Sequence, residues 1–126
     1  MKLRILIGAL LAAAPVAATA AMPVSTFLAK AEKLKKKGPL AMFSGDIKLL
    51  MGQVKTDAAE LRAENKAAEA AGKPKAYCTP AAGVKLSDRD ILSAMQAVPP
   101  AERGRTSTKA AFRAYFARRY PCPVKA

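Results

Sequence analysis

The sequence has no histidine and only two cysteines among its 126 residues. Without histidine, the Ser-His-Asp triad and the commonest general base near neutral pH are ruled out. Two cysteines are too few for the usual zinc ligand sets, and no glycine-rich phosphate loop occurs. No serine is followed three residues later by a lysine, which removes the Ser-x-x-Lys class of enzyme. We therefore expect no catalytic residue, no cofactor and no metal: the chain is not predicted to be an enzyme.

Residues 1–20 read MKLRILIGALLAAAPVAATA, with Lys2 and Arg4 ahead of an apolar run and small residues at its end. This is the layout of a secretory signal peptide, and Ala18 and Ala20 match the small-x-small cleavage pattern. The alternative is a retained anchor, but the apolar run is short for a bilayer span of about 20 residues and contains Pro15. The sequence thus predicts a cleaved signal peptide, residues 1–20, a single domain, residues 21–126, and export to the periplasm.

Positive charge dominates the chain, with 22 lysines and arginines against nine carboxylates and a net charge of +13. Removal of Lys2 and Arg4 with the signal peptide leaves about +11. A strongly basic protein attracts acidic partners. In an exported protein these are anionic lipid, cell-wall polymer or an acidic protein, and location argues against nucleic acid. The alternative is an ordinary solvated basic surface.

The two cysteines, Cys78 in AYCTP and Cys122 in RRYPCP, stand 44 positions apart. Neither belongs to a Cys-x-x-Cys redox motif. In an oxidising compartment such a pair commonly forms a structural disulfide, and two cysteines allow one intramolecular pairing. A loop of this span would stabilise the fold by about 4 kcal/mol, less any strain.

The apolar spacing is helical throughout, which predicts an all-α fold: a small four-helix domain closed by one disulfide. The first helix is expected at about residues 25–37, and the second from Asp46 to about residue 71. The third should run up to Pro99 and the fourth up to Pro121. The expected N-caps are Ser25, Ser44 or Asp46, Ser87 with Asp90 in a capping box, and Thr106 or Ser107. The alanine-rich end of the second helix either protrudes or packs thinly.

The first helix ends in a lysine run that contains Lys35, Lys36 and Lys37. Cations near a helix C-terminus interact favourably with the helix dipole, which is an ordinary structural role. A run of this kind is also typical of surfaces that bind membranes or acidic partners. These lysines are therefore candidate partner-binding residues.

The C-terminal half, residues 77–122, carries YCTP, a helix with ILSAM, then VPP, ERGRTS and a closing YPC. This pattern resembles the Rap1a/Tai immunity-protein family, small exported helical proteins that protect bacteria from peptidoglycan amidase effectors of type VI secretion. The resemblance implies structural roles for Cys78 and Cys122 and a protein partner, an amidase effector. Arg103 and Arg105, in the turn before the last helix, are candidate contact residues. The alternative is that they cap helices or pair with nearby carboxylates.

Two functions follow from different classes. One is a periplasmic protein-binding module of the immunity type. The other is a basic envelope-associated protein that binds anionic lipid or cell-wall polymer through its first helix. A third possibility is a small acid-stress chaperone, a class of protein with similar size and a single disulfide. This chain has no histidine and few carboxylates, so few of its groups would titrate below neutral pH. A homodimer is left open by the sequence.

Overall fold

The computed structural model describes residues 21–123; the predicted signal peptide, residues 1–20, and residues 124–126 lie outside this range. The element order is α1 (Val24–Lys37), η1 (Gly38–Phe43), α2 (Gly45–Ala70), α3 (Asp88–Gln96), η2 (Pro100–Glu102) and α4 (Thr108–Arg119). The predicted all-α fold with four α-helices is confirmed for this part of the chain.

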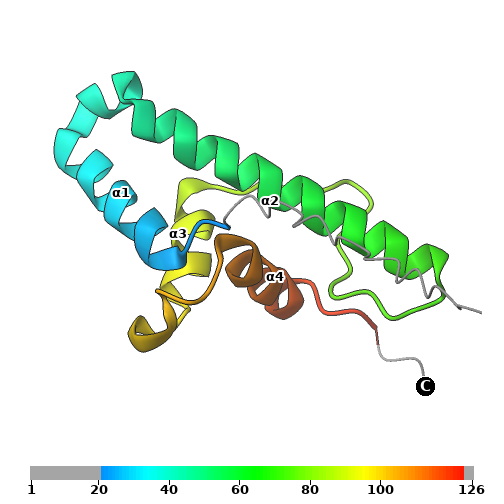
Figure 1. The fold of residues 1–126 in the computed structure, drawn as a ribbon. Coiled ribbons are helices and arrows are strands. Elements are labelled where there is room, and N and C mark those ends of the chain that lie inside the picture. The colour runs from blue at the N-terminus through cyan, green and yellow to red at the C-terminus, as the bar shows by residue number, and fades with distance from the viewer. Residues whose placement is uncertain (1–20, 124–126) are drawn as a thin grey trace, which may run out of the picture.

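Helices α1 and α2 form a hairpin, with the short 3-10 helix η1 at its far end (Figure 1). Gly38 ends α1 with a φ of 55°, a conformation that glycine adopts without a steric penalty. Pro39, at the first turn of η1, has no amide to continue the helix. Of the two expected caps for α2, Ser44 fills the position: its hydroxyl accepts a hydrogen bond from the Asp46 amide at 3.3 Å.

The beginning of α1 differs from the prediction. The helix begins at Val24, and Pro23 rather than Ser25 occupies the N-cap position. The amides of Val24 and Ser25 donate instead to the backbone carbonyls of Thr106 and Arg103, at 2.8 and 3.0 Å. A turn that is distant in sequence thus supplies the acceptors that a capping side chain would otherwise provide. The prediction of a Ser25 cap is wrong for this reason.

The caps of α3 and α4 follow local sequence rules. The Ser87 hydroxyl accepts from the Asp90 amide while the Asp90 carboxylate accepts from the Ser87 amide, so the predicted capping box is confirmed. For α4 the cap is Ser107, whose hydroxyl accepts from the Ala110 amide at 3.1 Å. The alternative cap, Thr106, turns its hydroxyl to a carbonyl of the preceding turn.

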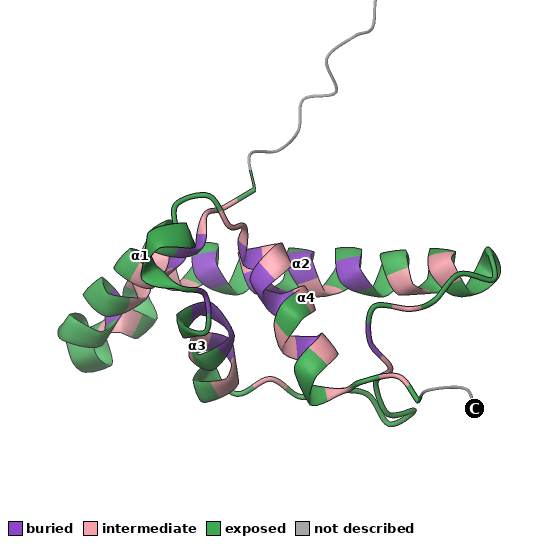
Figure 2. Ribbon diagram, turned by 90° about the horizontal axis from the view of Figure 1, so that it is seen from below, coloured by how far each residue is buried: buried purple, intermediate pink, exposed green. Residues whose placement is uncertain are grey.

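One apolar cluster joins the four α-helices (Figure 2). It also includes Tyr77, from the irregular segment between α2 and α3, whose ring lies 5.0 Å from that of Phe116. Its buried members are Val24, Phe27, Leu34, Leu50, Val54, Leu61, Tyr77, Ile91, Ala94, Met95, Val98, Ala111, Phe112 and Phe116. The core therefore lies where the helices meet, and η1 contributes no buried residue to it.

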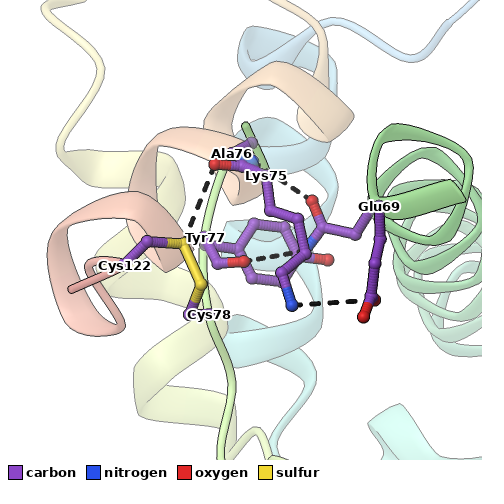
Figure 3. The surroundings of a disulfide bond; sticks show 7 residues. Glu69, Lys75, Ala76, Tyr77, Cys78 and Cys122 are labelled. Atoms are coloured by element: carbon purple, nitrogen blue, oxygen red, sulfur yellow. Dashed lines mark hydrogen bonds and ion pairs between the residues drawn. A yellow bond between two sulfur atoms is a disulfide. The ribbon is translucent and has the colours of Figure 1, made fainter. Parts of the chain in front are cut away.

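Cys78 and Cys122 form the predicted disulfide, which joins the segment before α3 to the segment after α4 (Figure 3). Their Cα atoms lie 4.8 Å apart. The Cys78 amide also donates to the carbonyl of Tyr120 at 2.8 Å. The backbone hydrogen bond and the covalent bond thus hold the same two segments together beside the Tyr77 ring.

We expect the double substitution Cys78→Ser with Cys122→Ser to lower the free energy of unfolding by about 4 kcal/mol, because the unfolded chain regains the entropy of an open loop. Denaturant unfolding measures the change. The matched control is the unsubstituted protein in reductant, which should lose the same amount. Equal stability of the oxidised protein and the double variant would contradict a structural role for the bond.

Candidate functional site

The end of the hairpin exposes large apolar side chains. Leu40, Met42 and Phe43, all in η1, are 70%, 74% and 88% exposed, and Leu49 and Met51 in the first turns of α2 are 48% and 41% exposed. Burying one such side chain stabilises a fold by about 1.5–3 kcal/mol, and these exposed side chains do not contribute that stabilisation. We call residues 33–51 the hairpin tip. It is the part of the described chain where exposed large apolar residues gather.

The hairpin tip is also strongly basic. It contains five exposed lysines and a single carboxylate, Asp46, which forms an ion pair with Lys30 of α1 at 3.3 Å. The lysines are Lys33, Lys35, Lys36, Lys37 and Lys48. The sequence predicted the lysine run Lys35–Lys37 as a candidate site, and the structure places that run directly beside the exposed η1 side chains.

Two of these lysines have weak local partners. The Lys36 ammonium lies 4.0 Å from the Glu32 carboxylate, one helical turn earlier, and both side chains are more than two-thirds exposed. The Lys37 ammonium donates to the Ser44 hydroxyl at 3.3 Å. The exposed Lys36–Glu32 ion pair and the exposed Lys37–Ser44 hydrogen bond contribute little to stability, so either lysine can exchange its contact for a partner.

The two candidate arginines lie elsewhere. The carbonyl of Arg103 accepts from the first turn of α1, whereas Lys37 is the last residue of that helix. At 1.5 Å per residue, these two ends of α1 are separated by roughly 18 Å. The predicted site residues therefore form two groups rather than one surface.

Arg103 has a structural role in the fold. Its guanidinium Nε donates to the Val98 carbonyl at 2.8 Å, and Nη2 donates to the Gln96 carbonyl at 3.0 Å. Gln96 is the last residue of α3 and Val98 lies just beyond it, at a helix end where carbonyls lack intrahelical donors. The Arg105 side chain, in contrast, is exposed. Of the two interpretations that the sequence left open for Arg103, helix capping matches this geometry.

Helix α2 is held to α4 by charged pairs on the surface. The Lys109 ammonium lies 3.1 Å from Glu60 and 2.6 Å from Glu64, and the Arg113 guanidinium lies 2.8 Å from Glu64. The hydrogen bonds from Lys109 and Arg113 lower the pKa of Glu64. The stabilisation from Glu64 is therefore present above its unfolded pKa and is lost as the pH falls.

The alanine-rich end of α2 is mostly exposed and is contacted on one side by the chain that follows it. The Asn65 side-chain amide donates to the Tyr77 carbonyl at 2.9 Å, and its oxygen accepts from the Ala76 amide at 3.3 Å. Near the helix end, Lys75 pairs with Glu69 at 3.7 Å (Figure 3). The returning segment thus packs thinly along α2 and leaves a groove of about 410 Å³ against it.

Asp57 is a buried carboxylate that was not predicted from the sequence, and its side chain is only 2% exposed. It accepts hydrogen bonds from the Thr108 hydroxyl at 2.6 Å and from the Gln53 amide at 2.8 Å. Its signal was its place in the stripe Leu50, Val54, Asp57, Leu61, where a polar residue shares the apolar spacing. Burial raises the pKa of Asp57, and the hydrogen bonds oppose this rise. Asp57 thereby links α2 to the first turn of α4.

Two kinds of site are absent from residues 21–123. No group of three or more acidic or cysteine side chains could hold a metal ion in this range. No helix in the same range is long and apolar enough to cross a membrane. The hairpin tip remains as the surface that has both an unusual composition and unusual exposure.

Substitution of Asp57 tests the buried carboxylate. Asp57→Ala should lower the free energy of unfolding by about 1–3 kcal/mol, because the Thr108 hydroxyl then lacks its buried partner. Asp57→Asn keeps an oxygen acceptor for the Thr108 hydroxyl, so it should lower the free energy of unfolding at pH 7 by less than Asp57→Ala does. Since burial raises the pKa of Asp57 above its ordinary value of 3.8, the wild type should gain stability relative to Asp57→Asn as the pH falls towards that value. Thermal unfolding measured against pH gives both effects. A wild type that loses stability relative to Asp57→Asn as the pH falls would contradict a raised pKa for Asp57.

Arg103→Ala should lower the free energy of unfolding by about 1.5–3 kcal/mol, because two carbonyls lose a charged donor. Arg105→Ala removes the same charge from an exposed neighbour and is the matched control, with an expected change within about 0.5 kcal/mol. Denaturant unfolding of both variants gives the comparison. Equal losses of stability in the Arg103→Ala and Arg105→Ala variants would contradict the capping role of Arg103.

Comparison with known proteins gives no match: no family model, no curated protein and no solved structure is similar to this chain. The resemblance of residues 77–122 to the Rap1a/Tai family therefore stays a prediction. The hairpin tip is the feature of the fold from which a function can be inferred.

Proposed function

We propose that this chain is an exported, non-catalytic, periplasmic protein that attaches to an anionic surface of the bacterial envelope through its hairpin tip. The observation that carries this proposal is the concentration of five lysines around a tip whose single carboxylate is already paired with Lys30. The disulfide fits an oxidising compartment.

The distribution of the acidic residues supports the same proposal. Glu60 and Glu64 neutralise cations of α4, Glu69 pairs with Lys75, and Asp57 is buried. These carboxylates are thus engaged in the body of the protein, while the hairpin tip has five lysines against the single carboxylate Asp46. An anionic surface that approaches the tip is therefore attracted to it.

The strength of this attraction can be bounded. A lysine near an anionic bilayer contributes about 1 kcal/mol, so five contribute on the order of 5 kcal/mol at most. That corresponds to a dissociation constant of roughly 0.1–1 mM. Charge alone thus gives a weak, reversible attachment that salt screens within about 8 Å at physiological ionic strength.

The test replaces Lys35, Lys36 and Lys37 with glutamine together and measures binding to anionic vesicles and to a phosphate-containing cell-wall polymer. At low salt we expect affinity to fall about a hundredfold, since three contacts of about 1 kcal/mol are lost. Exposed lysines remote in sequence, Lys66, Lys73 and Lys85, are changed to glutamine in the control, which removes equal charge and should weaken binding less. If neither surface retains the wild type at low salt, the proposal fails.

A second candidate is a protein-binding role of the immunity type, directed at a peptidoglycan amidase effector. The specific observation in its favour is that the two ends of the resembling pattern, Cys78 and Cys122, are joined covalently. Arg105, exposed in the turn before α4, is then the contact candidate. Expression in the periplasm should protect cells challenged with an effector encoded beside this gene; cells that die at the same rate with and without the protein would eliminate this role.

A further inference from the structure

The three most exposed large apolar side chains of the described range, Leu40, Met42 and Phe43, occupy one short helix. In a 3-10 helix, residues three apart lie on the same side, which places Leu40 and Phe43 together. Figure 1 shows η1 at the end of the hairpin, away from α3 and α4. The tip therefore presents these apolar side chains together at the end of the hairpin.

The charged residues around this point distinguish a lipid surface from a protein partner. Every cation of the hairpin tip is a lysine, and the arginines of residues 21–123 all lie at residue 62 or beyond. Protein interfaces are enriched in arginine and depleted of lysine. Lysine side chains, in contrast, extend along apolar surface while their ammonium groups stay at a polar boundary. A bilayer with anionic headgroups accommodates both features at once.

A second copy of this chain is a poorer occupant. Two hairpin tips packed together would bring ten lysines to one interface, against two carboxylates that already pair with Lys30. Like charges brought together in this way oppose association. A lipid surface supplies the opposite charge and an apolar interior.

From this combination we propose that η1 inserts Leu40, Met42 and Phe43 into the outer acyl region of an anionic phospholipid bilayer while the tip lysines contact the phosphates. The inference rests on the proposed attachment to anionic surfaces and names the lipid bilayer as the surface. Insertion supplies the second contribution that stable attachment requires, since charge alone binds weakly. The core stays outside the bilayer because η1 contributes no buried residue to it.

The absence of tryptophan from the sequence allows a direct test. Phe43→Trp places a single reporter at the tip, and Ala101→Trp places one in η2, where the side chain is also exposed. With anionic vesicles, the emission of the Phe43→Trp protein should shift to shorter wavelength and be quenched by lipids brominated on their acyl chains. The Ala101→Trp emission should not change. With a soluble polyanion, neither reporter should shift.

The triple substitution of Leu40, Met42 and Phe43 by serine provides the second measurement. It should reduce affinity for anionic vesicles by about tenfold or more, as expected for removing buried apolar area. It should leave binding to the soluble polyanion unchanged, and its melting temperature should match that of the wild type because these side chains lie outside the core.

The outcomes separate the two proposals. Vesicle binding that is equal for the wild type and the serine variant, with no quenching of the tryptophan emission of the Phe43→Trp protein, would overturn insertion and leave electrostatic attachment intact. No binding to vesicles or polyanion at low salt would overturn both. A dimer that forms in solution for the wild type and not for the serine variant would assign the apolar tip to a second copy and also overturn insertion.

Discussion

The contact between α2 and α4 is the interaction on which the rest of the structure depends. At its centre, the Asp57 carboxylate accepts a hydrogen bond from the Thr108 hydroxyl, and both side chains are nearly inaccessible to solvent. On its surface, Glu64 bridges Lys109 and Arg113. The contact combines a buried hydrogen bond with exposed charge pairs, so three of the nine acidic residues of this basic chain, Asp57, Glu60 and Glu64, lie at one interface. The hairpin tip has five lysines against one carboxylate, and the side chains of its η1 segment lie outside the core.

The features that the sequence predicted well are those set by neighbouring residues. Ser87 and Asp90 satisfy each other's amides within one turn, so the capping box needs no tertiary information. The disulfide was predictable because two cysteines allow one pairing. The start of α1 was not, because its amides use carbonyls from the turn at Arg103 to Thr106. Arg103 was ambiguous for the same reason: only the folded chain shows which carbonyls lie within its reach.

Some residues of the candidate site could be predicted from the sequence, and others could be identified only from the fold. Lys35, Lys36 and Lys37 were found from charge alone, since a lysine run is visible in the sequence. The apolar residues beside them were not singled out, because a run such as GPLAMF is equally compatible with a buried turn. Burial depends on whether another element covers the segment, and no element of the described chain covers Leu40, Met42 or Phe43 of η1. Asp57 shows the converse case, a charged residue that the fold removes from water.

The hydrogen bonds between the start of α1 and the segment before α4 have a consequence for how the protein is made. The Val24 amide pairs with a carbonyl far along the chain, at Thr106, and the Thr108 amide pairs with the Met22 carbonyl. Because a chain is synthesised from its N-terminus, α1 emerges long before its acceptors exist. Such non-local contacts pay a large loop-closure entropy and form late. The first turn of the first helix is thus completed only after residue 106 has been synthesised, although the helix packs against α2, its neighbour in the chain.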